Sequence, residues 1–145
     1  MNKPTDLSAT TFTLNGQHAQ CHPAPGQRLS EMLREQLDAR DVKIGCNAGD
    51  CGACTVLVDG APVCACLMPA QQAAGRAVET PAGLHANDPT AHALGESFQN
   101  HGAAQCGICT PGMMASAVAL LRANPQPTET QVEDALGGGL CGCTG

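Results

Sequence analysis

The amino-acid sequence predicts an α+β fold, with strands in the first half of the chain and helices in the second. Asn15-Gly16 and Asp59-Gly60 each lie between two short extended runs, which is typical of a two-residue hairpin turn because both turn residues tolerate positive φ. From residue 90 onward, apolar residues recur with helical spacing instead. A chain of 145 residues suits one domain or two small ones, and this change of pattern favours two.

Two hairpins and one helix are expected in the first half. Residues 10–14 and 17–21 flank the first turn, and residues 55–58 and 63–67 flank the second. The helix is expected over residues 28–39, where apolar residues recur three and four positions apart, with Ser30 as a candidate N-cap. The other expected elements are a glycine- and cysteine-rich loop and a short strand, over residues 45–54 and 76–79.

The second half is predicted to be helical after a short linker. Residues 81–89 have the proline, glycine and asparagine content of a linker. Helices are then expected over residues 90–101, over residues 111–123 with Thr110 as N-cap, and from Thr128 onward. The predicted organisation is a first domain, a linker and a helical domain, over residues 1–80, 81–89 and 90–145.

The composition excludes several classes of function. A net charge of −6 with only seven Lys and Arg excludes nucleic-acid binding, and no apolar run approaches the roughly 18 residues of a membrane span. No secretory signal is visible at the start, so we expect a reducing, cytoplasmic location, although export together with a partner stays open. In such a compartment, the ten cysteines are more often metal ligands or catalytic groups than disulfides.

The first group of cysteines has the spacing of plant-type 2Fe–2S ferredoxins. Cys46, Cys51 and Cys54 follow the pattern C-x4-C-x2-C, which is less typical of zinc ribbons. A fourth ligand must come from further along the chain. Cys64 and Cys66 are both placed to supply it, since residues two apart on a strand face the same side, so the spacing does not choose between them.

Glycines in the same loop suit an anionic cluster. Four thiolates on two irons carry negative charge, which backbone N–H groups pointing at the sulfurs offset. Gly45, Gly49 and Gly52 are therefore expected to let the loop wrap closely around the cluster, with positive φ.

The second group of cysteines combines two pairs that are far apart in the sequence. Cys106 and Cys109 form C-x2-C, and Cys141 and Cys143 form C-x-C. Cys109 directly precedes a predicted helix, whose N-terminus favours an anionic group nearby. A thioredoxin-like dithiol needs no further cysteines, so it is disfavoured, but structural zinc stays open for this group.

Three segments together resemble a known family: CNAGDCGACTVLVDG, QCGICTPGMM and LCGCTG. From about Thr11 to Gly145, the chain resembles the iron–sulfur small subunit of the xanthine oxidase family of molybdenum hydroxylases. That family includes carbon monoxide dehydrogenase, aldehyde oxidoreductases, and isoquinoline and nicotinate dehydrogenases. The resemblance implies a ferredoxin-like β-grasp domain followed by an all-α four-helix domain, each holding one 2Fe–2S cluster.

The resemblance also implies which cysteines are ligands. It places the fourth ligand of the first cluster twelve residues after the third and before a leucine, which selects Cys66 over Cys64. Cys64 and Cys21 are then expected to be small buried apolar residues. The implied ligands of the first cluster are Cys46, Cys51, Cys54 and Cys66. Those of the second cluster are Cys106, Cys109, Cys141 and Cys143.

The implied partner is a large subunit that holds a molybdopterin cofactor. Gln105 and Cys143 would face the pterin, and electrons would leave through the first cluster towards a flavin subunit or another acceptor, such as a cytochrome. The chain would thus be the electron-transfer subunit of an oxidoreductase complex, with no catalytic base of its own. The alternatives are a free-standing electron carrier with two clusters and a zinc-stabilised interaction module.

Overall fold

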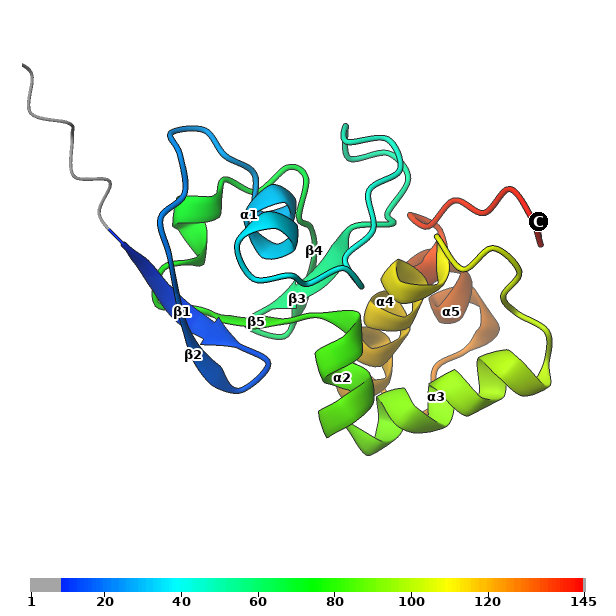
Figure 1. The fold of residues 1–145 in the computed structure, drawn as a ribbon. Coiled ribbons are helices and arrows are strands. Elements are labelled where there is room, and N and C mark those ends of the chain that lie inside the picture. Colours follow the sequence, from blue (N-terminus) through cyan, green and yellow to red (C-terminus); the bar gives the residue numbers. More distant parts are fainter. Residues whose placement is uncertain (1–8, 145) are drawn as a thin grey trace, which may run out of the picture.

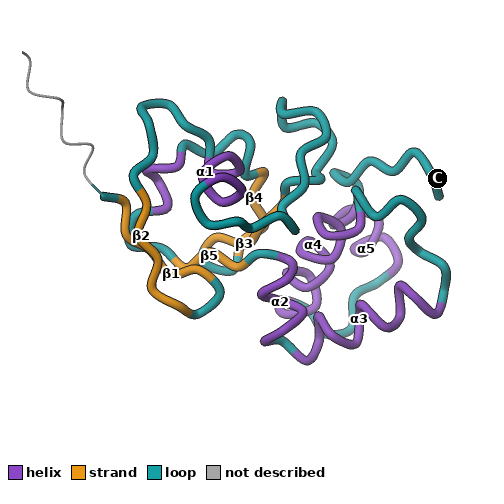
Figure 2. The backbone as a smooth tube through the Cα atoms, viewed as in Figure 1, coloured by secondary structure: helices purple, strands orange, loops and turns teal. Residues whose placement is uncertain are grey.

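The computed structural model describes residues 9–144, and within them it contains five strands, five α-helices and one short 3₁₀ helix. All the strands and α1 form one lobe, and α2 to α5 form a second lobe beside it (Figures 1 and 2). The strands are β1 (Thr10–Leu14), β2 (Gln17–Cys21), β3 (Thr55–Val58), β4 (Ala61–Cys64) and β5 (Ala77–Glu79). The helices are α1 (Leu29–Glu35), the 3₁₀ helix η1 (Ala70–Ala73), α2 (Pro81–Asn87), α3 (Pro89–Asn100), α4 (Thr110–Ala123) and α5 (Glu129–Leu136). None of the helices in the described residues is long and apolar enough to span a bilayer.

The five strands form one mixed sheet in the order β2-β1-β5-β3-β4. Both predicted hairpins are confirmed, and the turn residues have the expected left-handed backbone: φ is 51° and 81° at Asn15 and Gly16, and 50° and 82° at Asp59 and Gly60. Strand β5 returns from η1 and pairs parallel with β1 and antiparallel with β3. It therefore joins the two hairpins into one sheet.

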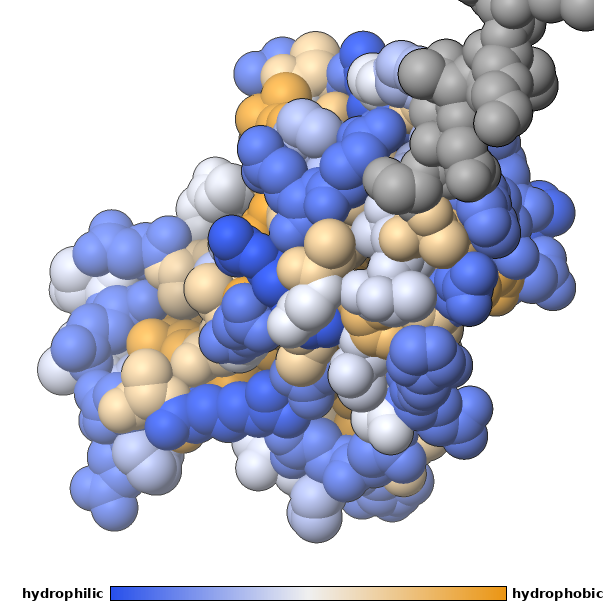
Figure 3. All heavy atoms as spheres, turned by 90° about the vertical axis from the view of Figure 1, so that its left-hand side faces the viewer, coloured by the Kyte–Doolittle hydropathy of each residue, from blue (hydrophilic) through white to orange (hydrophobic). Residues whose placement is uncertain are grey.

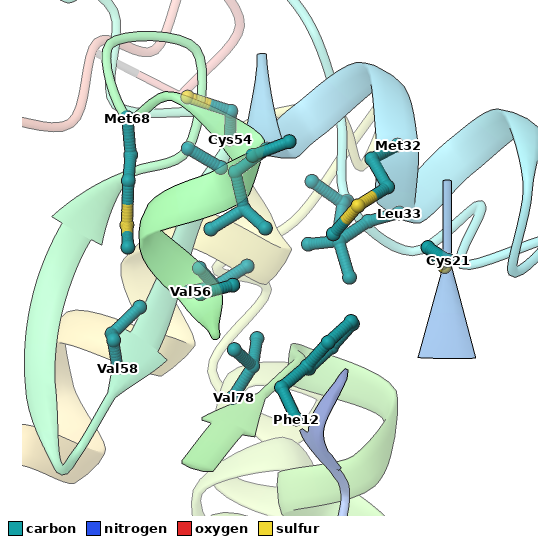
Figure 4. Packing of buried hydrophobic residues seen from close by; sticks show 14 of the residues in the cluster. Phe12, Cys21, Met32, Leu33, Cys54, Val56, Val58, Met68 and Val78 are labelled. Atoms are coloured by element: carbon teal, nitrogen blue, oxygen red, sulfur yellow. The ribbon is translucent and has the colours of Figure 1, made fainter. Parts of the chain in front are cut away.

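Helix α1 packs across one face of this sheet. Its buried residues Met32 and Leu33 lie over Phe12, Val56 and Val78, and together they form the main apolar core (Figure 4). The predicted helix over residues 28–39 is longer than the observed one. Figure 3 shows the side of the molecule that faces left in Figure 1, where hydrophilic residues predominate and hydrophobic ones lie between them.

The start of α1 differs from the prediction for a local reason. The Glu31 carboxylate accepts a hydrogen bond from the Arg28 N–H at 3.2 Å, so Arg28 takes the cap position. Ser30 is buried inside the helix, and its hydroxyl has no hydrogen-bond partner. At the other end, Asp38 has a φ of 52°, which does not continue a right-handed helix.

Strand β3 is buried on both faces and connects the two lobes. Val56 faces the core beneath α1, whereas Leu57 belongs to a second core with Leu84, Ala115 and Val118 of the helical lobe. Successive side chains of a strand point to opposite faces, which explains how one short strand serves both cores. The two lobes are therefore packed together through β3 and α4.

Two predicted segments differ from the structure. The strand expected over residues 63–67 is β4, which ends at Cys64, because its pairing partner β3 is only four residues long and Thr55 pairs with Cys64. The chain then turns, with the Leu67 N–H donating to the Cys64 carbonyl at 2.9 Å. Cys66 therefore lies beyond the strand rather than on it.

The segment expected to be a linker contains helix α2. The Thr80 hydroxyl accepts a hydrogen bond from the Gly83 N–H, and Pro81 occupies the first turn, where a missing N–H costs nothing. Asn15 also accepts a hydrogen bond from the Thr80 N–H at 2.8 Å. Residues 81–89 thus contain α2 and the start of α3, with Pro81 in the first turn of α2 and Asp88 as the N-cap of α3.

One ion-pair cluster joins the lobes at this point. Arg122 of α4 donates two hydrogen bonds to Glu79 at the end of β5, at 2.9 and 3.0 Å, and it contacts Asp88 at 2.7 Å. Burial alone would raise the pKa of Asp88, but hydrogen bonds from Arg122 and from the Thr90 N–H outweigh it and hold that pKa below its ordinary value. The cluster therefore connects β5, the α2–α3 junction and α4.

Replacing Arg122 with alanine is expected to lower the free energy of unfolding by about 1–2 kcal/mol, after allowance for a side chain that is 37% exposed. Asp88 contributes stability above its unfolded pKa of about 3.9, and this contribution is lost as the pH falls through the lower folded value. The difference between wild type and variant should therefore shrink below about pH 4. Urea unfolding at several pH values measures this difference in the free energy of unfolding.

The exposed pair of Arg76 and Asp59 provides the control, because Arg76→Ala should leave the free energy of unfolding almost unchanged. Equal losses in the two variants would contradict this account.

Candidate metal centres

The first cysteine loop (residues 45–54) precedes β3 and is held in a tight conformation. Asn47 and Gly49 have left-handed backbones, with φ of 55° and 82°. Arg28, at the start of α1, donates a hydrogen bond from its guanidinium to the Asn47 carbonyl at 3.0 Å. The cysteine spacing does not point to Arg28 or Asn47, although asparagine is one of the few residues that tolerate this backbone.

The thiol of Cys46 lies at the centre of this loop. Its sulfur accepts hydrogen bonds from the backbone N–H groups of Ala48, Asp50 and Cys51, each at 3.3 Å. The N–H groups of Ala48, Cys51 and Asp50 lower the pKa of Cys46 to about 6. The loop thus stabilises negative charge on this sulfur, as binding of an anionic cluster requires.

Cys51 and Cys54 are less exposed than Cys46. The sulfur of Cys51 accepts hydrogen bonds from the backbone N–H groups of Cys46, at 3.4 Å, and Ala53, at 3.5 Å. Cys54 is buried, and its sulfur accepts a hydrogen bond from the Cys66 N–H at 3.4 Å. Burial raises the pKa of the Cys54 thiol to about 12. A buried thiol of this kind loses its proton at neutral pH only when a metal replaces it.

Cys66 and Cys64 both lie near these thiols. Cys66 is buried and contacts Cys54 through its N–H, whereas Cys64 is half-buried at the end of β4. Burial raises the pKa of the Cys64 thiol, and neighbouring charge on Cys66 adds to this effect. Cys21, by contrast, packs inside the core below α1 (Figure 4), as expected for a small apolar side chain. The choice of Cys66 over Cys64 stays a prediction.

The three loop glycines have different roles. Gly49 and Gly52 have the expected positive φ, 82° and 71°. Gly45 does not, and its role is spatial, because a Cβ atom there would lie 2.8 Å from the sulfur of Cys51. Leu67 lies over Gly49, where a Cβ atom would overlap its side chain. The expectation of positive φ at Gly45 is therefore wrong.

The second cysteine group (Cys106, Cys109, Cys141 and Cys143) is brought together across the helical lobe. The Gln105 side-chain amide donates a hydrogen bond to the Cys143 carbonyl at 3.4 Å, which places residues 105–109 beside the C-terminal segment. Two groups of Thr144 contact the sulfur of Cys141: the hydroxyl at 2.9 Å and the backbone N–H at 3.3 Å. Together they lower the pKa of Cys141 to about 6, with the hydroxyl contributing most. The group therefore contains at least one thiol that is stabilised as a thiolate.

The start of α4 adjoins this group. Thr110 does not cap the helix as predicted: Cys109 occupies the N-cap position, and the Thr110 hydroxyl is buried without a partner. Burial raises the pKa of Cys109, and the hydrogen bond with Cys141 raises it further. The pKa of Cys106 is lowered instead, mainly by a hydrogen bond from the Ile108 N–H. The uncapped N–H groups of α4 thus lie beside a cysteine of the group.

Exposed apolar side chains flank both cysteine groups. Among the described residues, five large hydrophobic side chains are exposed, and four of these lie next to cysteine motifs. Ile44 and Leu67 border the first cysteine loop, and Ile108 and Leu140 border the second group. Each cysteine group is therefore bordered by two exposed apolar side chains.

The donor set fits clusters of two irons. A 2Fe–2S cluster spreads four thiolates over two metal atoms. The glycine at position 45, which leaves room beside Cys51, and the three N–H groups at Cys46 both suit an anionic group bound in the first loop.

Comparisons with known proteins agree with this chemistry. Residues 12–81 match a family model described as a 2Fe-2S iron-sulfur cluster binding domain, and residues 80–145 match one described as a [2Fe-2S] binding domain. The whole chain is 43% identical to the nicotinate dehydrogenase small FeS subunit of Eubacterium barkeri and covers 89% of it. The chain belongs to the iron–sulfur small subunits of the xanthine oxidase family of molybdenum hydroxylases. Like other members, this small subunit has a ferredoxin-like domain followed by a helical one.

Two further relatives support this membership. The small subunit is 44% identical to the xanthine dehydrogenase iron-sulfur-binding subunit of Escherichia coli O157:H7, over 92% of its own length and 84% of that protein. It superposes on the solved quinoline 2-oxidoreductase of Pseudomonas putida 86 with a TM-score of 0.90 and 42% identity, covering 97% of its own length and 86% of that chain. The names of these relatives describe parts of oxidoreductases.

Alanine at position 45 of this small subunit is expected to weaken retention of the first cluster roughly 10- to 100-fold, the equivalent of a crowding cost of about 1–3 kcal/mol. A free Cys51 thiol could rotate away from the new Cβ atom, but a sulfur bound to iron could not. Gly138→Ala is the matched control, because a Cβ atom there meets nothing within 4 Å. Iron content and visible absorbance after incubation with a chelator measure retention. Equal retention in both variants would show that Cys51 is not fixed by a metal.

Proposed function

We propose that this small subunit is the electron-transfer subunit of a molybdenum-dependent oxidoreductase complex. It conducts electrons from a large, molybdopterin-binding subunit towards a flavin subunit or another acceptor, such as a cytochrome. When bound, each 2Fe–2S cluster supplies one-electron redox chemistry. The observation that carries the proposal is the presence of one group of cysteines in each lobe, each inside a separate match to a 2Fe–2S family model.

We assign four cysteine ligands to each cluster. The ligands of the first are Cys46, Cys51, Cys54 and Cys66. The ligands of the second are Cys106, Cys109, Cys141 and Cys143. The N–H groups at Cys46 and the contact between Cys54 and Cys66 support the first set, and the hydrogen bond from Gln105 to Cys143 supports the second. We place the boundary between the two cluster-binding domains at residues 80–81, where the family matches meet.

The large subunit is proposed to dock on the surface around the second group. Gln105 and Cys143 are both exposed and joined by a hydrogen bond, so they are placed to face the molybdopterin. Ile108 and Leu140 add exposed apolar surface beside them. This chain is assigned no catalytic base, and its residues hold and space the redox groups. The reaction itself belongs to the partner.

Purification of the chain with its partners from the native host tests this proposal. The expected product is red-brown, contains iron and molybdenum, and gives two 2Fe–2S electron paramagnetic resonance signals after reduction. A colourless product with bound zinc would contradict electron transfer and favour a zinc-stabilised interaction module. Recovery of an iron-containing chain without a molybdopterin subunit would favour a free-standing carrier with two clusters.

A further inference from the structure

The two cysteine groups meet through their backbones. The Leu140 N–H donates a hydrogen bond to the carbonyl of Cys51 at 2.9 Å. Leu140 directly precedes Cys141 of the second group, and Cys51 belongs to the first cysteine loop. In Figure 1, the C-terminal segment and this loop both lie beside the same end of α4. A single hydrogen bond thus joins a proposed ligand of one cluster to the neighbour of a ligand of the other.

Glycines make this close contact possible. A Cβ atom on Gly112, in the first turn of α4, would overlap the carbonyl oxygen of Gly52 and would lie 3.3 Å from the carbonyl carbon of Ala53. A Cβ atom on Gly52 would in turn overlap the carbonyl oxygen of Gly138. These obstacles are backbone atoms, which cannot rotate away. The first cysteine loop and the helical lobe therefore touch with no side chain between them.

The Gly52 carbonyl is also held in place from its own side. It accepts hydrogen bonds from the Thr55 N–H at 3.2 Å and from the Thr55 hydroxyl at 2.7 Å, and Thr55 is buried in β3. A larger residue at position 112 must then move α4 away from the loop. Glycine is a poor helix former, so its presence in a helical turn calls for a packing reason, which the contact with Gly52 supplies.

We propose that Gly112 is a positioning residue that sets the separation between the two cluster sites. It lets the first cysteine loop rest directly on α4, and the Leu140 N–H then fixes the second group against the same loop. This inference rests on the proposed function, because the spacing of two sites has a meaning only if both hold redox groups. Electron exchange between two centres falls steeply with their separation, so a residue that fixes it affects the transfer rate without touching either cluster.

The decisive variant is Gly112→Ala, studied in the intact complex. Reduction of both clusters produces two electron spins, whose dipolar coupling falls with the cube of their separation. We expect Gly112→Ala to lose part or all of the splitting that wild type shows, and hydrogen exchange at the Leu140 amide to become faster. Gly138→Ala makes the same chemical change beside the same contact, but its Cβ atom meets nothing within 4 Å. It should keep the wild-type splitting and exchange rate.

A second pair of variants tests the contact without adding bulk to the helix. Leu140→Pro removes the N–H donor to Cys51, whereas Leu140→Ala keeps it and removes the same exposed side chain. Loss of splitting in Leu140→Pro alone supports the proposal even if Gly112→Ala fails to assemble. Wild-type splitting in both Gly112→Ala and Leu140→Pro, with full iron content, would overturn it and leave the proposed function intact. A wild-type complex with no iron would overturn both.

Discussion

Cys66→Ser is expected to remove one of the two 2Fe–2S electron paramagnetic resonance signals of the reduced complex, together with half of its iron, whereas Cys64→Ser keeps both. Cys66 is buried, whereas Cys64 is half-buried at the end of β4. The Cys66 N–H also donates a hydrogen bond to the sulfur of Cys54. A serine oxygen is a harder and poorer ligand than a thiolate for iron–sulfur chemistry. The effect of Cys66→Ser should therefore be close to complete loss of the first cluster.

Iron analysis and spectra of the two variants, purified side by side, measure this result. Cys21→Ser serves as a further control, because Cys21 lies in the apolar core and should affect stability without changing either signal. The opposite pattern, with a signal lost only in Cys64→Ser, would assign the fourth ligand to Cys64.

Cys141→Ser is expected to abolish the second cluster and to release α5 and the C-terminal segment from the helical lobe. None of the residues of α5 is fully buried, and a helix of eight residues is not stable in isolation. Its start is held by the capping box of Thr128 and Gln131. Beyond its other end, the segment is anchored by the Leu140 hydrogen bond and, in our proposal, by iron at Cys141 and Cys143.

Hydrogen exchange followed by mass spectrometry measures this release. Peptides from residues 129–144 should lose their protection from hydrogen exchange in Cys141→Ser. Peptides from the sheet under α1 should keep their protection, because the core of that lobe is independent of the second cluster. Thr144→Val provides a milder comparison, because it removes the hydroxyl beside Cys141 but keeps the thiol. Uniform loss of protection over both lobes would show instead that the second cluster stabilises the whole chain.

Local signals in the sequence were sufficient to predict several elements. The turns at Asn15 and Asp59 and the capping box at Thr128 all depend on residues a few positions apart, and all are confirmed. Helix α2 was missed because its proline and glycine also suit a linker. The hydroxyl of Thr80, which caps this helix, is a signal that could have revealed it.

Contacts between distant parts of the chain could not be predicted in this way. The position of β5 between β1 and β3, and the double burial of β3, depend on how α1 and α4 cover opposite faces of the sheet. The cysteines themselves stand out because their spacing is chemically constrained. Arg28 and Gly112 act through backbone atoms far away in the sequence, so no local pattern marks them.

The thiols with lowered pKa have a consequence for the newly made chain. Backbone N–H groups at Cys46 and the Thr144 hydroxyl at Cys141 hold the pKa of both thiols at about 6, below the ordinary thiol value, which favours the thiolate form. Thiolates react with peroxides, and the sulfenic acid that forms no longer binds iron as a thiolate does. We therefore expect oxidation of Cys46 or Cys141 in the iron-free chain to impair cluster binding, and reducing conditions during assembly to preserve it.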